Sequence, residues 1–211
     1  PGTNAEAMSR VQYFIGLAYL RKKMFNEAND YFKKALMSKL TVGSKNDPMV
    51  ADIYENIARV CVENDNWDEG LKNFKTAIEV RKEALGADDL KVSASYLNLG
   101  VLCAQKERFD DAIEFIKTAI DVRTKKTGPE DPVLGEFYTL LGKVTFQRGK
   151  TEEAISHLKK AVELKTKKKG SDPNPNSLAE VYLILGKAYQ EKCYFEDQYT
   201  EEAIKYFNLA L

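Results

Sequence analysis

Five copies of one pattern recur along the chain at an almost constant interval. Within each copy, spaced small residues predict two helices that pack closely as a hairpin. One such hairpin cannot bury its apolar face alone, so the copies are expected to stack into a solenoid, for which a fixed period of this length is typical. The marker residues, with spacings of 42, 42, 42 and 44, are Gly16, Ala58, Gly100, Gly142 and Gly186.

Composition narrows the possible function classes. The chain carries 32 basic and 32 acidic residues, and this balance argues against a nucleic-acid-binding module, which normally has a basic excess. No apolar run approaches the roughly 18 residues that a membrane-spanning helix needs, so no membrane insertion is expected. The three cysteines are odd in number, which favours a reducing, cytoplasmic location over a disulfide framework.

Apolar residues at helical spacing predict an all-α fold of ten helices, an α-α superhelix of five helix-turn-helix repeats. The chain stops inside the last expected helix, whereas a solenoid normally ends in a polar capping element, so we expect a fragment of a longer protein. The expected helices span residues 8–22, 26–41, 49–63, 67–85, 92–105, 109–126, 133–147, 151–168, 177–192 and 199–211.

Local signals support these boundaries. Pro48 and Pro132 suit the entry to a hairpin. Thr151 and Thr200, each followed by two glutamates, are expected to place a capping hydroxyl and acidic side chains at a helix start. Glycines are expected to terminate helices between units, at Gly86, Gly128 and Gly170.

The small-residue and aromatic positions resemble the tetratricopeptide repeat (TPR), and the resemblance covers residues 9–211. The usual unit has about 34 residues, and the longer unit here resembles the kinesin-light-chain subclass, as do Asn56 and Asn98. The asparagine pattern is broken, because other units carry Phe14, Leu140 and Ile184 at that position. The resemblance implies one solenoid domain over residues 1–211, with repeats at about 9–50, 51–92, 93–134, 135–178 and 179–211.

In a stacked array the first helices line the inner wall, which suits a peptide of a partner protein. The face not used by the core is expected to form this groove. In the second repeat this face comprises Asp52, Glu55, Asn56, Arg59, Val62 and Glu63. An alternative is that Leu17 and Val101 simply pack between neighbouring first helices. The predicted groove residues are Tyr13, Leu17, Glu55, Asn56, Arg59, Leu97, Asn98, Val101, Lys143 and Lys187.

One known binding mode does not fit this groove. Some TPR proteins clamp the carboxylate at the end of a chaperone tail with lysine, asparagine and arginine at fixed places. The first repeat has Tyr13 and Leu17 at those places, and the third repeat has Ala94 and Asn98. Only Asn56, in the second repeat, matches the clamp. A chaperone-tail carboxylate clamp is therefore not expected.

No sequence feature argues for catalysis, a cofactor or a metal site. His157 is the only histidine and is expected on the outer surface. Cys61 and Cys103 lie at equivalent apolar positions and are expected to pack as small core residues, whereas Cys193 falls near a turn where it could be exposed. A phosphate-binding Gly-x-x-x-x-Gly-Lys-Ser/Thr loop is absent from the sequence.

Two function classes remain. The first is a non-catalytic scaffold or adaptor that binds a peptide segment, in microtubule-based, kinesin or ciliary transport. The second is a regulatory module of a larger signalling or enzyme-containing protein. An aromatic-rich insertion at residues 193–200, with Tyr194, Phe195 and Tyr199, either packs on itself or contacts a partner.

Overall fold

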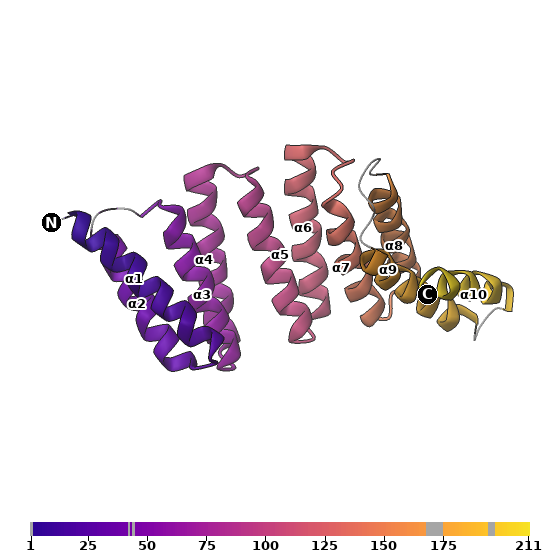
Figure 1. The fold of residues 1–211 in the computed structure, drawn as a ribbon, viewed down its shortest axis with the longest axis horizontal. Helices are drawn as coiled ribbons and strands as arrows, with labels where there is room; N and C mark the ends of the chain where they lie inside the picture. The colour runs from indigo at the N-terminus through magenta and orange to yellow at the C-terminus, as the bar shows by residue number, and fades with distance from the viewer. Residues whose placement is uncertain (1, 42, 44, 168–174, 194–196) are drawn as a thin grey trace. The chain divides into compact units, whose positions relative to one another are not determined.

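The computed structural model describes the chain except for residues 1, 42, 44, 168–174 and 194–196. The described residues form ten α-helices and one short 3-10 helix, η1 (Asp197–Tyr199), and include no strand (Figure 1). The helices are α1 (Gly2–Arg21), α2 (Phe25–Thr41), α3 (Pro48–Glu63), α4 (Trp67–Leu85), α5 (Leu90–Gln105), α6 (Phe109–Thr127), α7 (Leu134–Gln147), α8 (Thr151–Thr166), α9 (Pro175–Cys193) and α10 (Thr200–Leu209).

The chain divides into two compact units, and the division falls within α5. The first unit, Pro1–Ser95, contains α1 to α4 and the start of α5. The second unit, Tyr96–Leu211, contains the rest of α5 and α6 to α10. Consecutive helices pair as hairpins within the units, as α1 does with α2 and α7 with α8. The expected single domain stays a prediction.

Small residues bring the two helices of each hairpin together, as their spacing predicts. A β-carbon built at Gly16 would lie 2.7 Å from the ring of Phe32, and one at Gly142 would lie 2.5 Å from Cγ of Leu158. In the second hairpin Gly70 on α4 takes this part, because its β-carbon would lie 2.5 Å from a methyl carbon of Val62. The period in the sequence is therefore a period of close helix contacts.

Helix ends match most of the predicted signals. Pro48 opens α3 behind Asp47, whose side chain accepts a hydrogen bond from the Met49 backbone N–H over 2.7 Å. Gly86 and Gly128 terminate α4 and α6 with φ angles of 93° and 87°, a backbone region that favours glycine. Gly170 lies outside the described residues.

Some boundary predictions were wrong. Lys150 and Tyr199 hold the N-cap positions of α8 and α10, and neither makes a side-chain capping bond. Thr151 instead starts α8, and its hydroxyl donates to Glu191 over 3.0 Å. Thr200 likewise lies inside α10, so the expected hydroxyl caps are absent from these two helices, although the acidic first turns are present. α1 begins at Gly2, earlier than expected, and α10 ends at Leu209.

Each of the first four hairpins turns through one residue with a left-handed backbone. The residues are spaced by 42 and have φ angles between 58° and 82°: Lys23, Asp65, Glu107 and Gly149. Only the last is glycine, so the other three hold a conformation that is costly for residues with a β-carbon.

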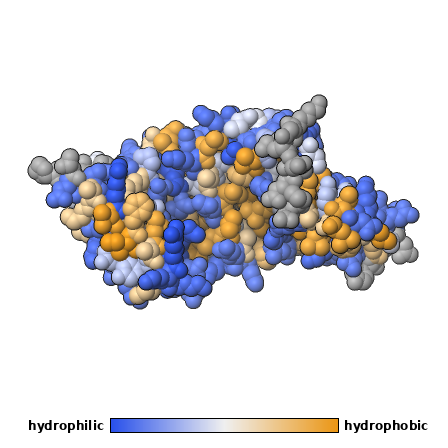
Figure 2. All heavy atoms as spheres, viewed as in Figure 1, coloured by the Kyte–Doolittle hydropathy of each residue, from blue (hydrophilic) through white to orange (hydrophobic). Residues whose placement is uncertain are grey.

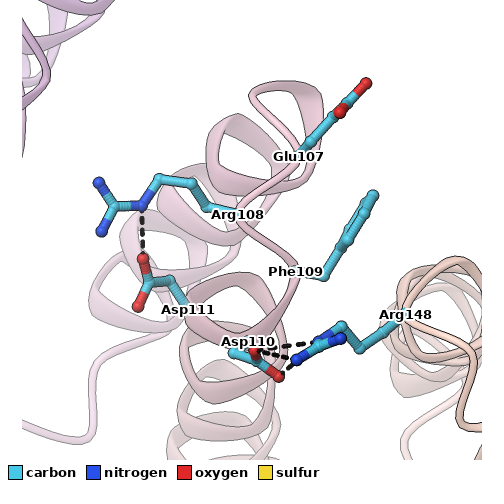
Figure 3. A pocket seen from close by; sticks show the side chains of 6 residues that line it. All are labelled: Glu107, Arg108, Phe109, Asp110, Asp111 and Arg148. Carbon is cyan, nitrogen blue, oxygen red and sulfur yellow. Dashed lines mark hydrogen bonds and ion pairs between the residues drawn. The ribbon is translucent and has the colours of Figure 1, made fainter.

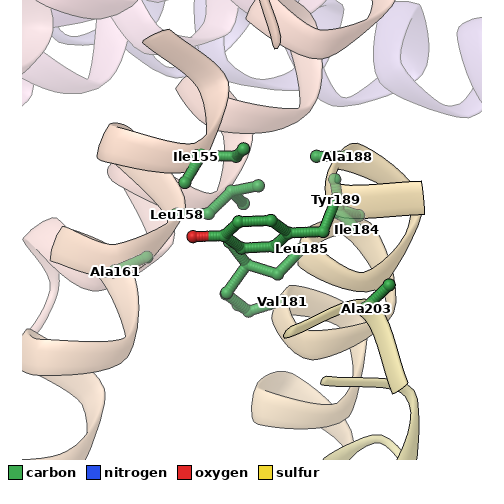
Figure 4. Packing of buried hydrophobic residues seen from close by; sticks show 9 residues of the cluster. All are labelled: Ile155, Leu158, Ala161, Val181, Ile184, Leu185, Ala188, Tyr189 and Ala203. Carbon is green, nitrogen blue, oxygen red and sulfur yellow. The ribbon is translucent and has the colours of Figure 1, made fainter. Parts of the chain in front are cut away.

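The core follows the joints between helices. In the second unit, buried side chains of α8 and α9 face each other, with Leu158 and Ala161 opposite Val181 and Leu185 (Figure 4). In the first unit, Phe32 and Ala35 of α2 pack with Ile53 and Ile57 of α3.

Candidate protein-binding surfaces

The predicted groove residues of the first unit are largely engaged within the protein. The Asn56 amide donates to the Asp52 backbone oxygen over 2.8 Å and to the Tyr13 hydroxyl over 3.3 Å. Burial and then the nearby Asp52 charge raise the pKa of Tyr13, so its hydroxyl stays protonated near neutral pH. Leu17 is half-buried against the first-unit core. These contacts fit the alternative that some groove positions serve packing.

Glu55 takes part in a buried charge cluster. The Arg81 guanidinium on α4 donates to Glu55 over 2.5 Å and also bonds Asp52 and the Ser95 hydroxyl. Burial opposes the charge on Arg81, but Glu55 and Asp52 outweigh it and raise the pKa of the guanidinium. Arg81 therefore joins the first helix of its own hairpin to the start of α5.

The Arg81 position recurs in the other hairpins with a spacing of 42 residues. Lys39 bonds Glu6 and Asp47, each over 2.6 Å. Arg123 bonds Asp131 over 2.7 Å, and Lys165 bonds Glu136 over 2.5 Å and Ser177. The basic ladder, as we call this set, consists of Lys39, Arg81, Arg123 and Lys165.

The charges of the basic ladder are stabilised by their partners. Burial alone would lower the pKa of Lys39, but the bonds to Asp47 and Glu6 raise it overall. Burial would raise the pKa of Asp131, but hydrogen bonds from the Val133 backbone and the Thr127 and Arg123 side chains lower it. Sequence analysis missed the ladder, although the 42-residue spacing of its basic residues could have indicated it.

The predicted groove position of Val62 was wrong. We expected it on the groove side of α3, but its side chain is buried in the contact with Gly70 on α4. Arg59 and Glu63 are the members of this predicted α3 face whose side chains are exposed.

The second unit leaves more of its predicted residues accessible. Asn98 is exposed on α5, where Leu97 and Val101 are half-buried. Lys143 on α7 and Lys187 on α9 are exposed at equivalent repeat positions. Lys143 reaches Glu180 on α9 over 3.2 Å, so an ion pair links two successive first helices. Leu183 lies one turn before Lys187 with 42% of its surface exposed. The accessible face therefore combines lysines with an apolar side chain.

A pocket of 340 Å³ lies at the turns of the third and fourth hairpins (Figure 3). Its charged side chains bond one another: Arg148 pairs with Asp110 over 2.9 Å, and Arg108 pairs with Asp111 over 2.6 Å. The arginine–aspartate bond lowers the pKa of Asp110. Because its charged side chains pair with one another, we interpret this pocket as a contact between the two hairpins rather than as a ligand site.

Comparison with known families identifies the repeat. A family model described as tetratricopeptide repeat matches residues 49–125 and 104–167, and a second model of that description matches residues 9–40. The chain belongs to the tetratricopeptide repeat family. No curated protein matches it in sequence. The TPR fold is a scaffold for protein–protein interaction and is generally non-catalytic.

Solved structures with the same fold include kinesin-light-chain-like repeats. A crystal structure of BtubC (BKLC) from P. vanneervenii is 18% identical, with a TM-score of 0.74, over 98% of this chain and 80% of that chain. Putative kinesin light chain TPR-like repeats of Podosopora anserina are 16% identical, with a TM-score of 0.69, over 95% and 93%. MamA protein is 20% identical, with a TM-score of 0.64, over 97% and 90%. At these identities the similarity shows the fold alone.

His157 is not the surface residue that its sequence position predicts. Its ring is half-buried on α8 of this TPR chain, 6.3 Å from the Tyr138 ring, and its Nε2 atom is buried without a hydrogen-bond partner. The equivalent pair in the preceding repeat is Tyr96 and Phe115, at 6.5 Å. His157 thus occupies an aromatic packing position.

The three cysteines of the TPR chain are free thiols. Cys103 is fully buried, and burial raises its pKa to about 12, so it is not a reactive thiolate near neutral pH. Cys61 and Cys193 are half-buried. The core prediction is confirmed for Cys103, and Cys193 is less accessible than its turn position allowed.

Two searches of the described residues were negative. They hold no group of three or more histidine, cysteine, aspartate or glutamate side chains that could bind a metal ion. Within the same residues, no helix is both long enough and apolar enough to cross a bilayer. Tyr194 and Phe195 of the predicted aromatic insertion lie outside the described residues, whereas Tyr199 packs 5.9 Å from Tyr189.

Proposed function

We propose that this TPR chain is a protein-binding adaptor that holds an extended peptide of a partner against exposed faces of its first helices. The observation that carries the proposal is the pair of exposed lysines, Lys143 and Lys187, at equivalent positions of α7 and α9, with the exposed Leu183 beside them. An extended peptide presents backbone groups and alternating side chains at a regular interval, which repeated positions can match.

The ligand chemistry follows from these side chains. Lysines favour carboxylates, and Leu183 offers an apolar contact, so the preferred peptide carries acidic residues next to an apolar anchor. The exposed Asn98 suits a hydrogen bond to a peptide backbone, and the half-buried Leu97 and Val101 extend the apolar area on α5. Because the lysines are exposed, the affinity should fall as salt rises.

The first unit contributes differently. Arg59 is its exposed cation and belongs to the proposed binding residues. Tyr13, Leu17, Glu55 and Asn56 stay candidates, but their hydrogen bonds and packing contacts must be shared or exchanged when a peptide binds. Their expected contribution is therefore smaller than that of Lys143 and Lys187.

The test uses a library of short peptides that combine acidic residues with one leucine or phenylalanine, measured by fluorescence anisotropy. We expect Lys143→Glu/Lys187→Glu to weaken the best binder at least tenfold at low salt. The matched control is Lys72→Glu/Lys75→Glu, which reverses two exposed lysines along an open groove of 610 Å³ on α4. If only the control variant loses binding, partners use the outer face and the proposal is wrong.

A transport adaptor is the narrower form of this proposal. It is supported by the fold shared with the putative kinesin light chain repeats and with BtubC (BKLC). The free thiols suit a cytoplasmic, reducing location. Cross-linking in cells followed by mass spectrometry should recover cytoskeletal or ciliary transport proteins; recovery of a signalling enzyme instead would favour the regulatory-module alternative.

A further inference from the structure

The exposed side of α7 and α9 carries one paired lysine and one open lysine. Lys143 on α7 pairs with Glu180 on α9 over 3.2 Å. Lys187 lies on the same side of α9 as Glu180, two helical turns further on, and forms no ion pair within the described residues. Seven residues of helix place it roughly 10 Å from the paired charges. We call this set, Lys143, Glu180 and Lys187, the α7–α9 face.

These positions are exposed in the middle of the repeat array as well. Glu136 and Lys143 occupy them on α7, and α8 and α9 follow in the chain. The Glu136 side chain is 65% exposed, and that of Lys143 is 48% exposed. The exposure of Glu180 and Lys187 is therefore a property of the repeat position and does not follow from where the sequence ends. Figure 2 shows hydrophilic and hydrophobic residues side by side over the second unit, so a partner there meets charges as well as apolar surface.

The preceding pair of first helices has no such charge pair. Val101 on α5 stands at the position of Lys143, so it offers no charge to Glu136 on α7. Glu136 instead accepts from Lys165 over 2.5 Å and from the Ser177 hydroxyl over 3.0 Å. The ion pair between successive first helices thus depends on the lysine at position 143.

Pairing changes what Lys143 offers to a ligand. A peptide carboxylate can bind Lys143 only by displacing Glu180, and it then lies beside that displaced negative charge. A peptide cation at the same place would be held by Glu180 but repelled by Lys143. Exposed ion pairs are weak, so exchanging one for another yields almost no net gain. Lys187 has no such competitor and keeps its attraction for a carboxylate.

We propose that Glu180 is a specificity-determining residue of the α7–α9 face. It cancels the charge of Lys143, so the face recognises one acidic residue, through Lys187, and is indifferent to charge at a second place. This inference rests on the proposed function and gives its two lysines unequal parts. An extended peptide advances roughly 3.3 Å per residue, so the second place lies about three residues from the acidic one.

The test measures four proteins against a set of peptides by fluorescence anisotropy at low salt. The parent peptide is the best binder in the acidic–apolar library that carries a single acidic residue. Glutamate, glutamine or lysine is placed three residues from that acidic residue, on its N-terminal side in one series and on its C-terminal side in the other. The wild-type chain should bind the three peptides of each series within twofold of one another.

Each single variant should uncover one charge. Glu180→Gln frees Lys143, so in one series the glutamate peptide should bind about two- to fivefold more tightly than the glutamine peptide. Lys143→Gln frees Glu180, so the lysine peptide of that series should gain by a similar factor. The double variant Lys143→Gln/Glu180→Gln should show no preference, like the wild type. Both side chains are half exposed, so folding should be preserved, and circular dichroism checks it.

The matched control is Glu114→Gln, which removes an exposed carboxylate from α6, a second helix. It changes the net charge as Glu180→Gln does and should keep the wild-type affinity ratios. An equal gain of the glutamate peptide in this control would overturn the inference, because net charge alone would explain it.

Two further outcomes separate this inference from the proposed function. If Lys187→Gln weakens all peptides but Glu180→Gln still binds them alike, Glu180 sets no specificity and the proposed function stands. If no peptide binds, or if Lys187→Gln changes nothing, both are overturned.

Discussion

Arg81 on α4 and Glu55 on α3 form an ion pair over 2.5 Å, with both side chains buried. A buried ion pair is a weak source of net stability, because both charges leave water, but removing one partner strands the other charge. The pair thus fixes the two helices relative to each other at a position that sequence analysis assigned to a binding groove.

Arg81→Ala should destabilise the chain by about 3–5 kcal/mol, because Glu55 is left buried without its partner. Urea unfolding monitored by circular dichroism measures the change. Arg81→Met/Glu55→Met should restore most of the loss, and Glu83→Ala on the exposed side of α4 should change little. A loss below 1 kcal/mol for Arg81→Ala would show that Glu55 reaches solvent.

Gly142→Ala should destabilise the chain by about 1–3 kcal/mol, although alanine favours a helix over glycine. The added β-carbon would lie 2.5 Å from Cγ of Leu158, which sits in the tight contact between α7 and α8. Thermal unfolding measures the effect, with Ser156→Ala on the exposed face of α8 as control. Adding Leu158→Ala should reduce the cost of Gly142→Ala, and purely additive effects would contradict the contact.

Leu99→Ala should cost about 2–5 kcal/mol, because Leu99 is fully buried on α5 and its loss leaves a cavity. Urea unfolding provides the measurement. The nearby exposed Asn98→Ala serves as a comparison and should change stability much less. A loss below half a kcal/mol for Leu99→Ala would mean that the site collapses around the smaller side chain.

His157 should make stability depend on pH. Burial and then the Lys117 charge lower its folded-state pKa below the usual value of 6.5, while Glu153 opposes this shift weakly. The unfolded chain therefore binds the proton more readily, so the contribution of His157 is full above pH 6.5 and is lost as the pH falls toward the folded-state pKa.

The comparison is between the wild type and His157→Phe, which introduces the residue that the preceding repeat carries at this position, Phe115. Melting temperatures measured from pH 8 to pH 5 should diverge, with the wild type losing more stability below pH 6.5. Parallel curves for the two proteins would show that His157 has the same pKa in both states.

Glu107→Gly should stabilise the chain by about 0.5–1 kcal/mol. Glu107 holds a φ of 58° at a hairpin turn, where the equivalent residue in the next repeat is Gly149. Glycine removes the free-energy cost of holding a β-carbon in a left-handed backbone. We expect this gain to exceed the cost of the extra conformational entropy that glycine gives the unfolded chain. Glu107→Asn should give a smaller gain, and Glu107→Ala should give none. A destabilised Glu107→Gly variant in thermal unfolding would refute this.

The repeat period determined the fold from sequence alone. Gly16, Gly142 and the other small residues predict where two helices touch, because only small side chains allow that approach, and the ten predicted helices agree with those described. Local signals at Pro48, Gly86 and Gly128 placed helix ends for the same reason, since they act through the backbone of neighbouring residues.

Tertiary structure decided which polar side chains remain available for a partner. Periodicity places Glu55, Asn56 and Val62 on one face of α3, but contacts with α1 and α4 engage or bury all three. The same holds for the basic ladder, whose acidic partners come from other helices or from the segments that precede them, and for His157, which the packing of α7 and α8 makes half-buried. A sequence pattern fixes the face that a residue occupies, whereas pairing and burial depend on what another helix places opposite it.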